Sequence, residues 1–146
     1  MTVDTFYEAE DNTNATMYDA KVDTLHRGAS GGSYVDMGSN GSYIEFFNIN
    51  GGLGGICSFS FRYASGASNG RLRPCAVTLN GKMIGSLDFR STRSWGSWKY
   101  NTIQAYCKAG VNDVRVTAGT ANGGPNLDGV KVNAPFAIKV SVVEMN

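Results

Sequence analysis

The sequence predicts an all-β domain built as a sandwich or jelly roll. Glycine supplies 19 of the 146 residues, about twice its usual share of ~7%, and long runs of strong helix formers do not occur. Short apolar or alternating segments lie between turn signals at nearly regular spacing, which is typical of sandwiches rather than of alternating strands and helices. The length suits one domain with its own core.

The alternating and apolar segments define the expected strands, which fall at residues 4–9, 33–37, 42–48, 56–63, 76–79, 82–89, 99–107, 113–118 and 128–132. In the fourth of these, a period of two places Cys57, Phe59, Phe61 and Tyr63 on one face, which we expect to form core. We therefore place the domain at residues 1–132, and expect residues 133–146 to add one more strand or to begin a linker.

Turn signals separate these segments. Glycine and asparagine adopt positive φ at low cost, and they gather at residues 38–41, 50–52, 80–81, 108–110 and 122–125. Asn80-Gly81 lies between two apolar segments and is a preferred sequence for a two-residue hairpin turn. The sequence therefore predicts a β-hairpin there.

The charge balance argues against two classes of partner. Thirteen basic and twelve acidic residues give a net charge of +1 without any block of like charges, so neither nucleic acid nor a membrane surface is expected to bind. No segment approaches the ~20 apolar residues of a membrane span, and the first residues lack the pattern of a signal peptide. We expect a monomeric domain tethered to others in a longer protein.

Glu8 and Glu10 form a pair of nearby carboxylates. A strand period of two places them on one face, where they repel each other unless a cation lies between them. Carboxylates that converge with backbone carbonyls suit calcium. Two solvated glutamates remain the alternative interpretation of the pair alone.

Two tryptophans, Trp95 and Trp98, stand in a Gly/Ser-rich segment before the strand expected at residues 99–107. Exposed aromatic faces can stack on the apolar faces of sugar rings. We expect Trp95 to be an exposed loop residue of this kind and Trp98 to belong to the core. Further along, Asn126 offers an amide that can both donate and accept hydrogen bonds toward sugar hydroxyls, although in isolation an ordinary turn explains it better.

Taken together and in order, these signals resemble carbohydrate-binding modules of families 6 and 35. The matching stretches cover about residues 6–132: Tyr7-Glu8-Ala9-Glu10, Ser33-Tyr34-Val35-Asp36, Phe61-Arg62-Tyr63-Ala64, Leu79-Asn80-Gly81, Trp95 with Trp98, Lys108-Ala109-Gly110-Val111-Asn112 and Asn126-Leu127-Asp128-Gly129-Val130. The chain departs from the pattern at Gly129, where relatives usually carry a large apolar residue. Lys21 and Asp23 are candidates for the polar residue that closes the cleft in some relatives.

The resemblance implies a jelly-roll β-sandwich of two antiparallel sheets, with a structural calcium and a sugar site formed by loops. Glu8, Glu10 and Asp128 correspond to the calcium carboxylates, aided by a backbone carbonyl such as that of Arg27. Tyr34 and Trp95 correspond to the aromatic walls of the sugar site, and Asn126 to its hydrogen-bonding amide. The same fold implies that Cys57 and Cys107 lie close enough to form a disulfide, which would leave Cys75 unpaired.

The function that follows is non-catalytic binding of a polysaccharide or oligosaccharide, by a module attached to a secreted or cell-surface carbohydrate-active enzyme. A stand-alone lectin or adhesion domain on the same fold is the alternative. A small hydrolase is less well supported, because the Gly-x-Ser-x-Gly spellings at residues 28–32 and 66–70 lack a following helix, and the only histidine is His26.

The charge of the sugar stays open. Arg90 and Arg93 lie close to Trp95 in sequence, and Arg71 and Arg73 lie in the preceding long turn. Arginines beside a stacking residue could bind a carboxylated or sulfated sugar, with Arg93 as the nearest candidate. Alternatively these arginines are solvated, and the ligand is a neutral glycan such as xylan, β-glucan or an agarose-type galactan.

Overall fold

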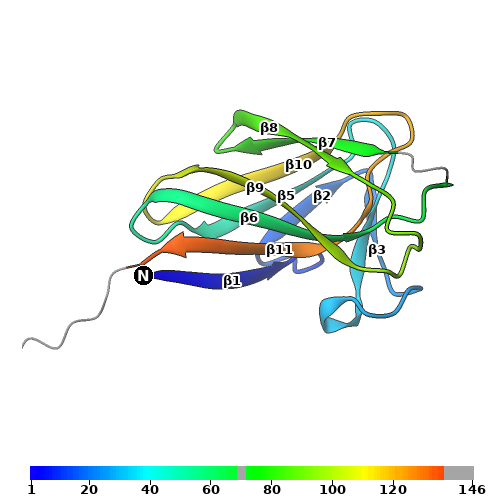
Figure 1. Ribbon diagram of the computed structural model, residues 1–146, viewed down its shortest axis with the longest axis horizontal. Coiled ribbons are helices and arrows are strands. Elements are labelled where there is room, and N and C mark those ends of the chain that lie inside the picture. The colour runs from blue at the N-terminus through cyan, green and yellow to red at the C-terminus, as the bar shows by residue number, and fades with distance from the viewer. Residues whose placement is uncertain (69–71, 137–146) are drawn as a thin grey trace, which may run out of the picture.

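Two antiparallel sheets pack face to face (Figure 1) in the computed structural model, which describes residues 1–68 and 72–136. The elements in chain order are β1 (Thr2–Glu8), β2 (Ala15–Tyr18), β3 (Ala20–Asp23), the 3-10 helix η1 (Ser30–Gly32), β4 (Tyr34–Met37), β5 (Tyr43–Asn50), β6 (Gly55–Ala64), β7 (Arg73–Leu79), β8 (Lys82–Phe89), β9 (Lys99–Cys107), β10 (Val111–Ala118) and β11 (Asn126–Pro135).

One sheet has the strand order β3-β4-β11-β6-β9, and the other has the order β2-β5-β10-β7-β8. Strand β11 is long enough to pair with two partners along the same edge, β4 at Asn126 and Leu127 and β1 from Gly129 to Pro135. This arrangement brings the end of β1 next to the start of β11. The all-β sandwich of two antiparallel sheets is confirmed.

The core lies between the sheets and contains the face of β6 that alternation indicated. Cys57, Phe59 and Phe61 are fully buried and Tyr63 is 5% exposed, whereas Ile56 on the opposite face is 56% exposed. Burying each large apolar side chain contributes ~1.5–3 kcal/mol to the free energy of folding. This prediction is therefore confirmed.

The β7–β8 hairpin closes at Asn80-Gly81, as expected. Leu79 pairs with Lys82, and Asn80 and Gly81 have φ values of 52° and 81°. Two consecutive residues with positive φ define the turn whose twist matches that of the flanking strands. Asparagine and glycine adopt this conformation at low cost, which explains why they stand here.

Three features differ from the expected strands. Strands β2 and β3 were not predicted, because each has four residues and they are separated only by Asp19, whose φ is 50°. Strand β11 continues past residue 132 to Pro135, since β1 pairs with it from Gly129 to Pro135. The remainder of the expected tail, residues 137–146, lies outside the described part of the chain.

The cysteines are three buried thiols, so the expected disulfide is not formed in this structure. The expected proximity of Cys57 and Cys107 is confirmed. Cys57 lies opposite Ala105 and Cys107 lies opposite Gly55 in the paired strands β6 and β9, and the two thiols interact. Burial, with Cys57 as an additional cause, raises the pKa of the Cys107 thiol to about 12. Cys57 and Cys107 are thus neighbouring but separate thiols.

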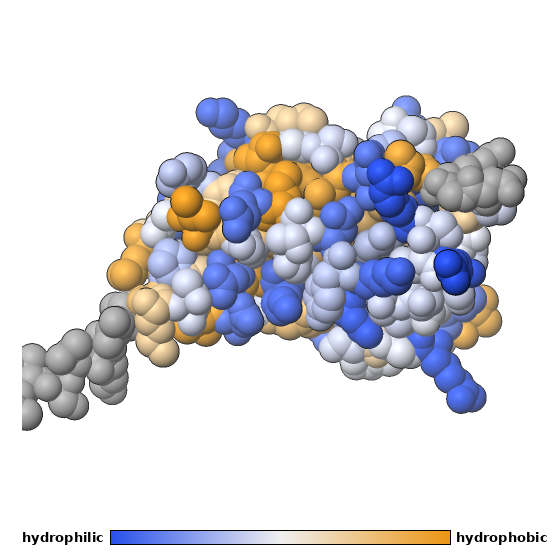
Figure 2. Space-filling view, in the orientation of Figure 1, coloured by the Kyte–Doolittle hydropathy of each residue, from blue (hydrophilic) through white to orange (hydrophobic). Residues whose placement is uncertain are grey.

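Apolar surface gathers over β8 and β9, the two edge strands that lie next to each other (Figure 2). Met83 on β8 is 58% exposed and Tyr106 on β9 is 77% exposed. Within residues 1–68 and 72–136, no helix has the length and hydrophobicity that crossing a membrane requires.

Candidate functional site

Strands β3 and β4, the starts of β7 and β11, and two loops surround a cleft of about 330 Å³. The loops at residues 24–33 and 90–98 gather at the same end of the sandwich, at the right of Figure 1. The cleft is lined by Asp23, Leu25, His26, Tyr34, Asp36, Arg73, Trp95 and Asn126. It therefore brings together three of the four residues expected to hold a sugar, Tyr34, Trp95 and Asn126, which are far apart in the sequence.

Trp95 stands on the loop between β8 and β9 and is half-buried. The loop is anchored at Thr92, which exchanges backbone and side-chain hydrogen bonds with Ser65. The indole packs directly on Gly66, where a Cβ atom would lie 2.4 Å from the ring. Only a residue without a side chain allows this contact, so Gly66 sets the position of the indole in the cleft.

Asn126 is 5% exposed and begins β11. Its Nδ2 donates a hydrogen bond of 3.0 Å to the backbone carbonyl of Trp95. The amide therefore ties the β8–β9 loop to the sheet, and Asn126, which lines the cleft, also carries the acceptor Oδ1.

Tyr34 lines the cleft but is fully buried, so it does not form an exposed wall. Its ring packs against Trp98, with centroids 5.3 Å apart, and against His26 at 6.2 Å. Its hydroxyl accepts a hydrogen bond from the backbone N–H of His26 across 3.3 Å. Tyr34 is thus the floor of the cleft and supports the loop at residues 24–33.

Trp98 is half-buried and does not belong to the core between the sheets, contrary to expectation. Its Nε1 donates to the carbonyl of Arg27 across 2.8 Å, and the guanidinium of Arg62 lies 5.5 Å from the ring centroid. The indole therefore packs on the outer side of the sheet, between Tyr34 and the loop at residues 24–33.

Among the residues that the structure describes, Arg73 is the arginine that lines the cleft, and Arg93 does not line it. Arg73 begins β7, and its guanidinium lies 5.1 Å from the centroid of the Trp95 ring while Nη1 donates to the carbonyl of Gly124. Arg93 is exposed and has a φ of 75° in the turn of the loop. Arg90 is also exposed, and Arg71 lies outside the described residues.

Two carboxylates, Asp23 on β3 and Asp36 on β4, complete the cleft. Asp23 is one of the two candidates named from the sequence for closing the cleft, whereas Asp36 was not singled out. Asp36 pairs directly with Asn126 across β4 and β11, and burial raises the pKa of its carboxyl. The pKa of Asp23 is lowered, because its carboxylate accepts hydrogen bonds from the backbone N–H groups of Leu25 and Thr24. Asp36 stands in the same short stretch as Tyr34, and alternation along that strand places both on one face.

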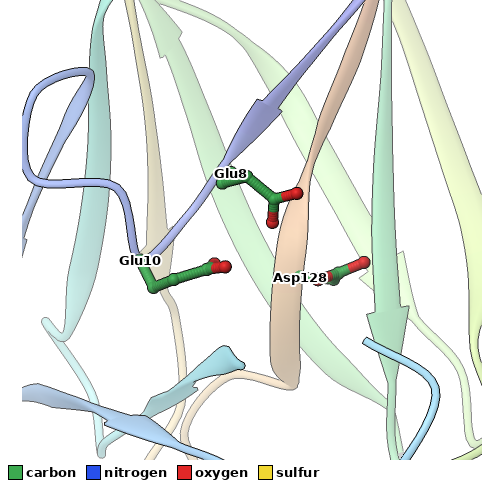
Figure 3. Close-up of side chains that lie close together, drawn as sticks. All are labelled: Glu8, Glu10 and Asp128. Carbon is green, nitrogen blue, oxygen red and sulfur yellow. The ribbon is translucent and has the colours of Figure 1, made fainter. Parts of the chain in front are cut away.

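A second cluster joins the end of β1 to β11. Glu8, Glu10 and Asp128 point toward one another (Figure 3), with ligand atoms all within 4.8 Å of each other. The Oε2 atoms of Glu8 and Glu10 are buried and have no hydrogen-bond partner among the described residues. Burial, followed by the neighbouring Glu8 and Asp128, raises the pKa of Glu10 to about 8.

Arg62 and Ser30 are the partners of this cluster that sequence reasoning missed. Asp128 is fully buried, accepts a hydrogen bond of 2.6 Å from Arg62 Nη1 and accepts the Ser30 N–H at 3.0 and 3.1 Å. The Ser30 hydroxyl donates to Glu8. Ser30 therefore donates hydrogen bonds to the carboxylate cluster through both its N–H and its hydroxyl. The helix that starts there has three residues, so the nucleophile-elbow geometry is not formed.

The cluster fits a hard cation, because three carboxylates converge, the Arg62 guanidinium pairs with only Asp128, and two of the buried oxygens have no partner among the described residues. The Arg27 carbonyl accepts the indole N–H of Trp98, and its role as a further ligand stays a prediction. The loop at residues 24–33 contacts both sites, since Ser30 binds the carboxylates and His26 lines the cleft.

Comparison with known proteins identifies the family. The family model "Carbohydrate binding module (family 6)" matches residues 8–134. An exo-beta-D-glucosaminidase of Amycolatopsis orientalis is 35% identical over 124 residues, which cover 84% of this chain and 11% of that protein. Endo-1,4-beta-xylanase B of Cellvibrio japonicus (strain Ueda107) is 27% identical over 116 residues, 78% of this chain and 19% of the xylanase.

Solved structures show the same relationship. A family 35 carbohydrate-binding module from Clostridium thermocellum superimposes with a TM-score of 0.82 at 38% identity, covering 89% of this chain and 97% of that one. The family 35 module from Paenibacillus barcinonensis has a TM-score of 0.81 at 35% identity, covering 90% and 99%.

Proposed function

This chain belongs to the carbohydrate-binding modules of the family 6 and family 35 type, and we propose that it binds an oligosaccharide or polysaccharide in the cleft beside Trp95 without catalysing its cleavage. One observation carries the proposal. The fold gathers Trp95, Asn126 and Tyr34 from three distant segments into one hollow of about 330 Å³, which is the size range of small-ligand sites.

The cleft has the groups that sugar recognition requires. The half-buried Trp95 offers an aromatic surface for the apolar face of a sugar ring. The Oδ1 of Asn126 and the carboxylates of Asp23 and Asp36 accept hydrogen bonds from hydroxyl groups, and Arg73 donates. Tyr34 supports these groups from below. The floor is thereby kept rigid before the sugar arrives, which reduces the entropic cost of binding.

The carboxylate cluster holds a structural calcium in this proposal. Glu8, Glu10 and Asp128 would supply its carboxylate oxygens, with the Arg27 carbonyl as a further ligand. When bound, the ion would neutralise the repulsion between the carboxylates and would tie β1 to β11. Arg62 remains beside Asp128 and limits how many of its oxygens face the ion.

The charge of the ligand depends on Arg73. Within residues 1–68 and 72–136, the charged groups that line the cleft are the guanidinium of Arg73 and the carboxylates of Asp23 and Asp36. This balance supports a neutral glycan, or a sugar with one carboxylate placed at Arg73. A family 35 module with 23% identity to this chain has been solved with a disaccharide that contains glucuronic acid, which is why both classes belong in the test.

The biological setting follows from the relatives. They are carbohydrate-active enzymes of which the matching segment is a small part, 11% of the glucosaminidase and 19% of the xylanase. We place the module, as a monomeric unit, in a secreted or cell-surface protein of this kind, where it would hold the enzyme against its glycan.

A glycan microarray with hydrolysis assays on the sugars that bind tests the proposal directly. We expect binding to a restricted set of glycans, with no release of reducing ends. Absence of binding to every glycan would contradict carbohydrate recognition, and hydrolysis of a bound glycan by the purified chain would contradict the non-catalytic role.

A further inference from the structure

A row of polar side chains continues the cleft across three strands. Lys21 on β3 pairs with Asp36 on β4, and Asp36 pairs with Asn126 on β11. Directly paired residues in neighbouring antiparallel strands point to the same side of the sheet. Because neighbouring strands are ~4.8 Å apart, the row extends ~10 Å from Asn126 to Lys21.

A second hollow lies along this row. It has a volume of about 330 Å³ and is lined by Asp19, Ala20, Lys21, Asp36, Met37 and Gly38. Asp36 also lines the cleft beside Trp95, so this residue borders both hollows. The cleft is therefore the first half of a longer groove that follows β3 and β4.

The second hollow has a rigid wall. The carbonyl of Asp19 accepts the N–H of Gly38 across 3.0 Å, and the Ser39 hydroxyl lies 3.4 Å from the Asp19 carboxylate. A Cβ at position 38 would lie 2.2 Å from the Asp19 carbonyl, so glycine is required for this close approach. Asp19 is thus held at the rim by the backbone of the adjacent strand.

The chemistry of the second hollow differs from that of the first. Lys21 donates hydrogen bonds and the carboxylates of Asp19 and Asp36 accept them, and none of the described residues that line this hollow is aromatic. Two carboxylates against one ammonium group disfavour an anionic ligand. Hydroxyl groups of an uncharged sugar residue match this set of donors and acceptors.

We propose that the groove binds at least two consecutive sugar residues, the first at Trp95 and Asn126 and the second, uncharged, between Lys21, Asp36 and Asp19. This inference rests on the proposed function and adds the second subsite to it. The first residue gains its affinity from stacking and the second from hydrogen bonds alone. Lys21 then raises the affinity for a chain of sugar residues but not the affinity for a single sugar.

The test compares Lys21→Met with Lys82→Met by calorimetric titration. Both lysines are exposed and both substitutions keep the aliphatic stem while removing the ammonium group, but Lys82 begins β8 and lies outside both hollows. The probes are four series, each of one to four residues: xylose to xylotetraose, glucose to isomaltotetraose, glucosamine to its tetramer, and glucuronic acid alone or as a cap on xylo-oligosaccharides.

In the series that binds, wild-type protein and Lys82→Met should show about five- to tenfold higher affinity for two residues than for one. Lys21→Met should lose this gain and keep the single-residue affinity, with an unchanged melting temperature. Equal affinity for one and for four residues, or a chain-length gain that survives in Lys21→Met, would overturn the second subsite alone. Failure of wild-type protein to bind any of the four series or any glycan of the microarray would contradict carbohydrate recognition and the subsite together.

Discussion

The side chain of Asn126 donates a hydrogen bond to the main-chain carbonyl of Trp95 across 3.0 Å. It joins the first residue of β11 to the loop that follows β8, and it places an amide directly beside an indole in the cleft. The bond uses the main chain of Trp95, so it persists when the indole is removed. The indole can therefore be tested without releasing the loop.

Replacing Trp95 with alanine should reduce glycan binding below detection. Losing one aromatic contact typically costs ~2 kcal/mol or more, which matters for a module expected to bind with a Kd between about 1 mM and 1 μM. The measurement is titration with a glycan that the wild-type protein binds. Tyr106→Ala is the matched control, because Tyr106 is 77% exposed on β9 and lies outside the cleft. Wild-type affinity in Trp95→Ala would contradict the site.

Replacing Tyr34 should affect folding before it affects binding. The ring is fully buried against Trp98 and His26, so Tyr34→Ala should lower the free energy of unfolding by ~3–5 kcal/mol. Tyr34→Phe keeps the ring and removes the hydroxyl, which accepts the His26 N–H and is hydrogen-bonded to the Asp23 side chain, at a cost of ~0.5–1.5 kcal/mol for each hydrogen bond lost. Denaturant titration measures both. A Tyr34→Ala variant as stable as wild type would show that the tyrosine does not support the floor of the cleft.

Arg73 and Arg93 should differ in their effect on binding. Arg73→Met removes a guanidinium that lines the cleft beside Trp95, and should weaken binding about tenfold if that group contacts the glycan. Arg93→Met removes an exposed guanidinium outside the cleft and should leave the affinity unchanged. Titrations at low and high salt show the charge of the ligand, because screening weakens binding of an acidic glycan only. An effect of Arg93→Met larger than that of Arg73→Met would reverse the assignment.

Calcium should raise the melting temperature, and chelator should lower it. An ion that binds only the folded chain at about a hundred times its Kd adds ~2.7 kcal/mol of stability, or roughly 5–10 °C for a domain of this size. Asp128→Asn should lose the calcium response, while Asp113→Asn, an exposed aspartate on β10, should keep it. Scanning calorimetry with calcium or chelator measures the difference. Identical melting curves in both conditions, with no calcium detected in the protein, would remove the ion from the proposal.

The calcium response should grow as the pH rises from 5 to 8. Without calcium, burial raises the pKa of Glu10 from 4.5 to about 8, so the folded state holds a proton that the unfolded chain releases. The contribution of Glu10 to the stability of the calcium-free protein is therefore fully present below pH 4.5. This contribution is lost as the pH rises toward 8. Calcium displaces that proton and offsets the loss. Melting curves at pH 5, 6.5 and 8 should show a widening gap between calcium and chelator, and a gap that narrows with pH would contradict the prediction.

Local sequence determined the features of this protein that depend on the alternation of side chains along a strand or on a positive φ in a turn. Alternation placed Cys57, Phe59, Phe61 and Tyr63 in the core, and Asn80-Gly81 defined the hairpin. Both follow from the backbone geometry of neighbouring residues, so no distant contact is needed to predict them. Alternation also placed Glu8 near Glu10, and the resemblance to a family added Asp128, which the structure brings into the same cluster.

Tertiary structure alone decided which side chains meet across the cleft. Arg73 rather than Arg93 faces Trp95, because the start of β7 passes the β8–β9 loop while Arg93 lies in its exposed turn. The burial of Tyr34 under Trp98 and the row from Lys21 through Asp36 to Asn126 depend in the same way on the pairing of β3, β4 and β11. Such contacts join residues far apart in the chain, and their geometry is set by strand order and register, which local propensities leave undetermined.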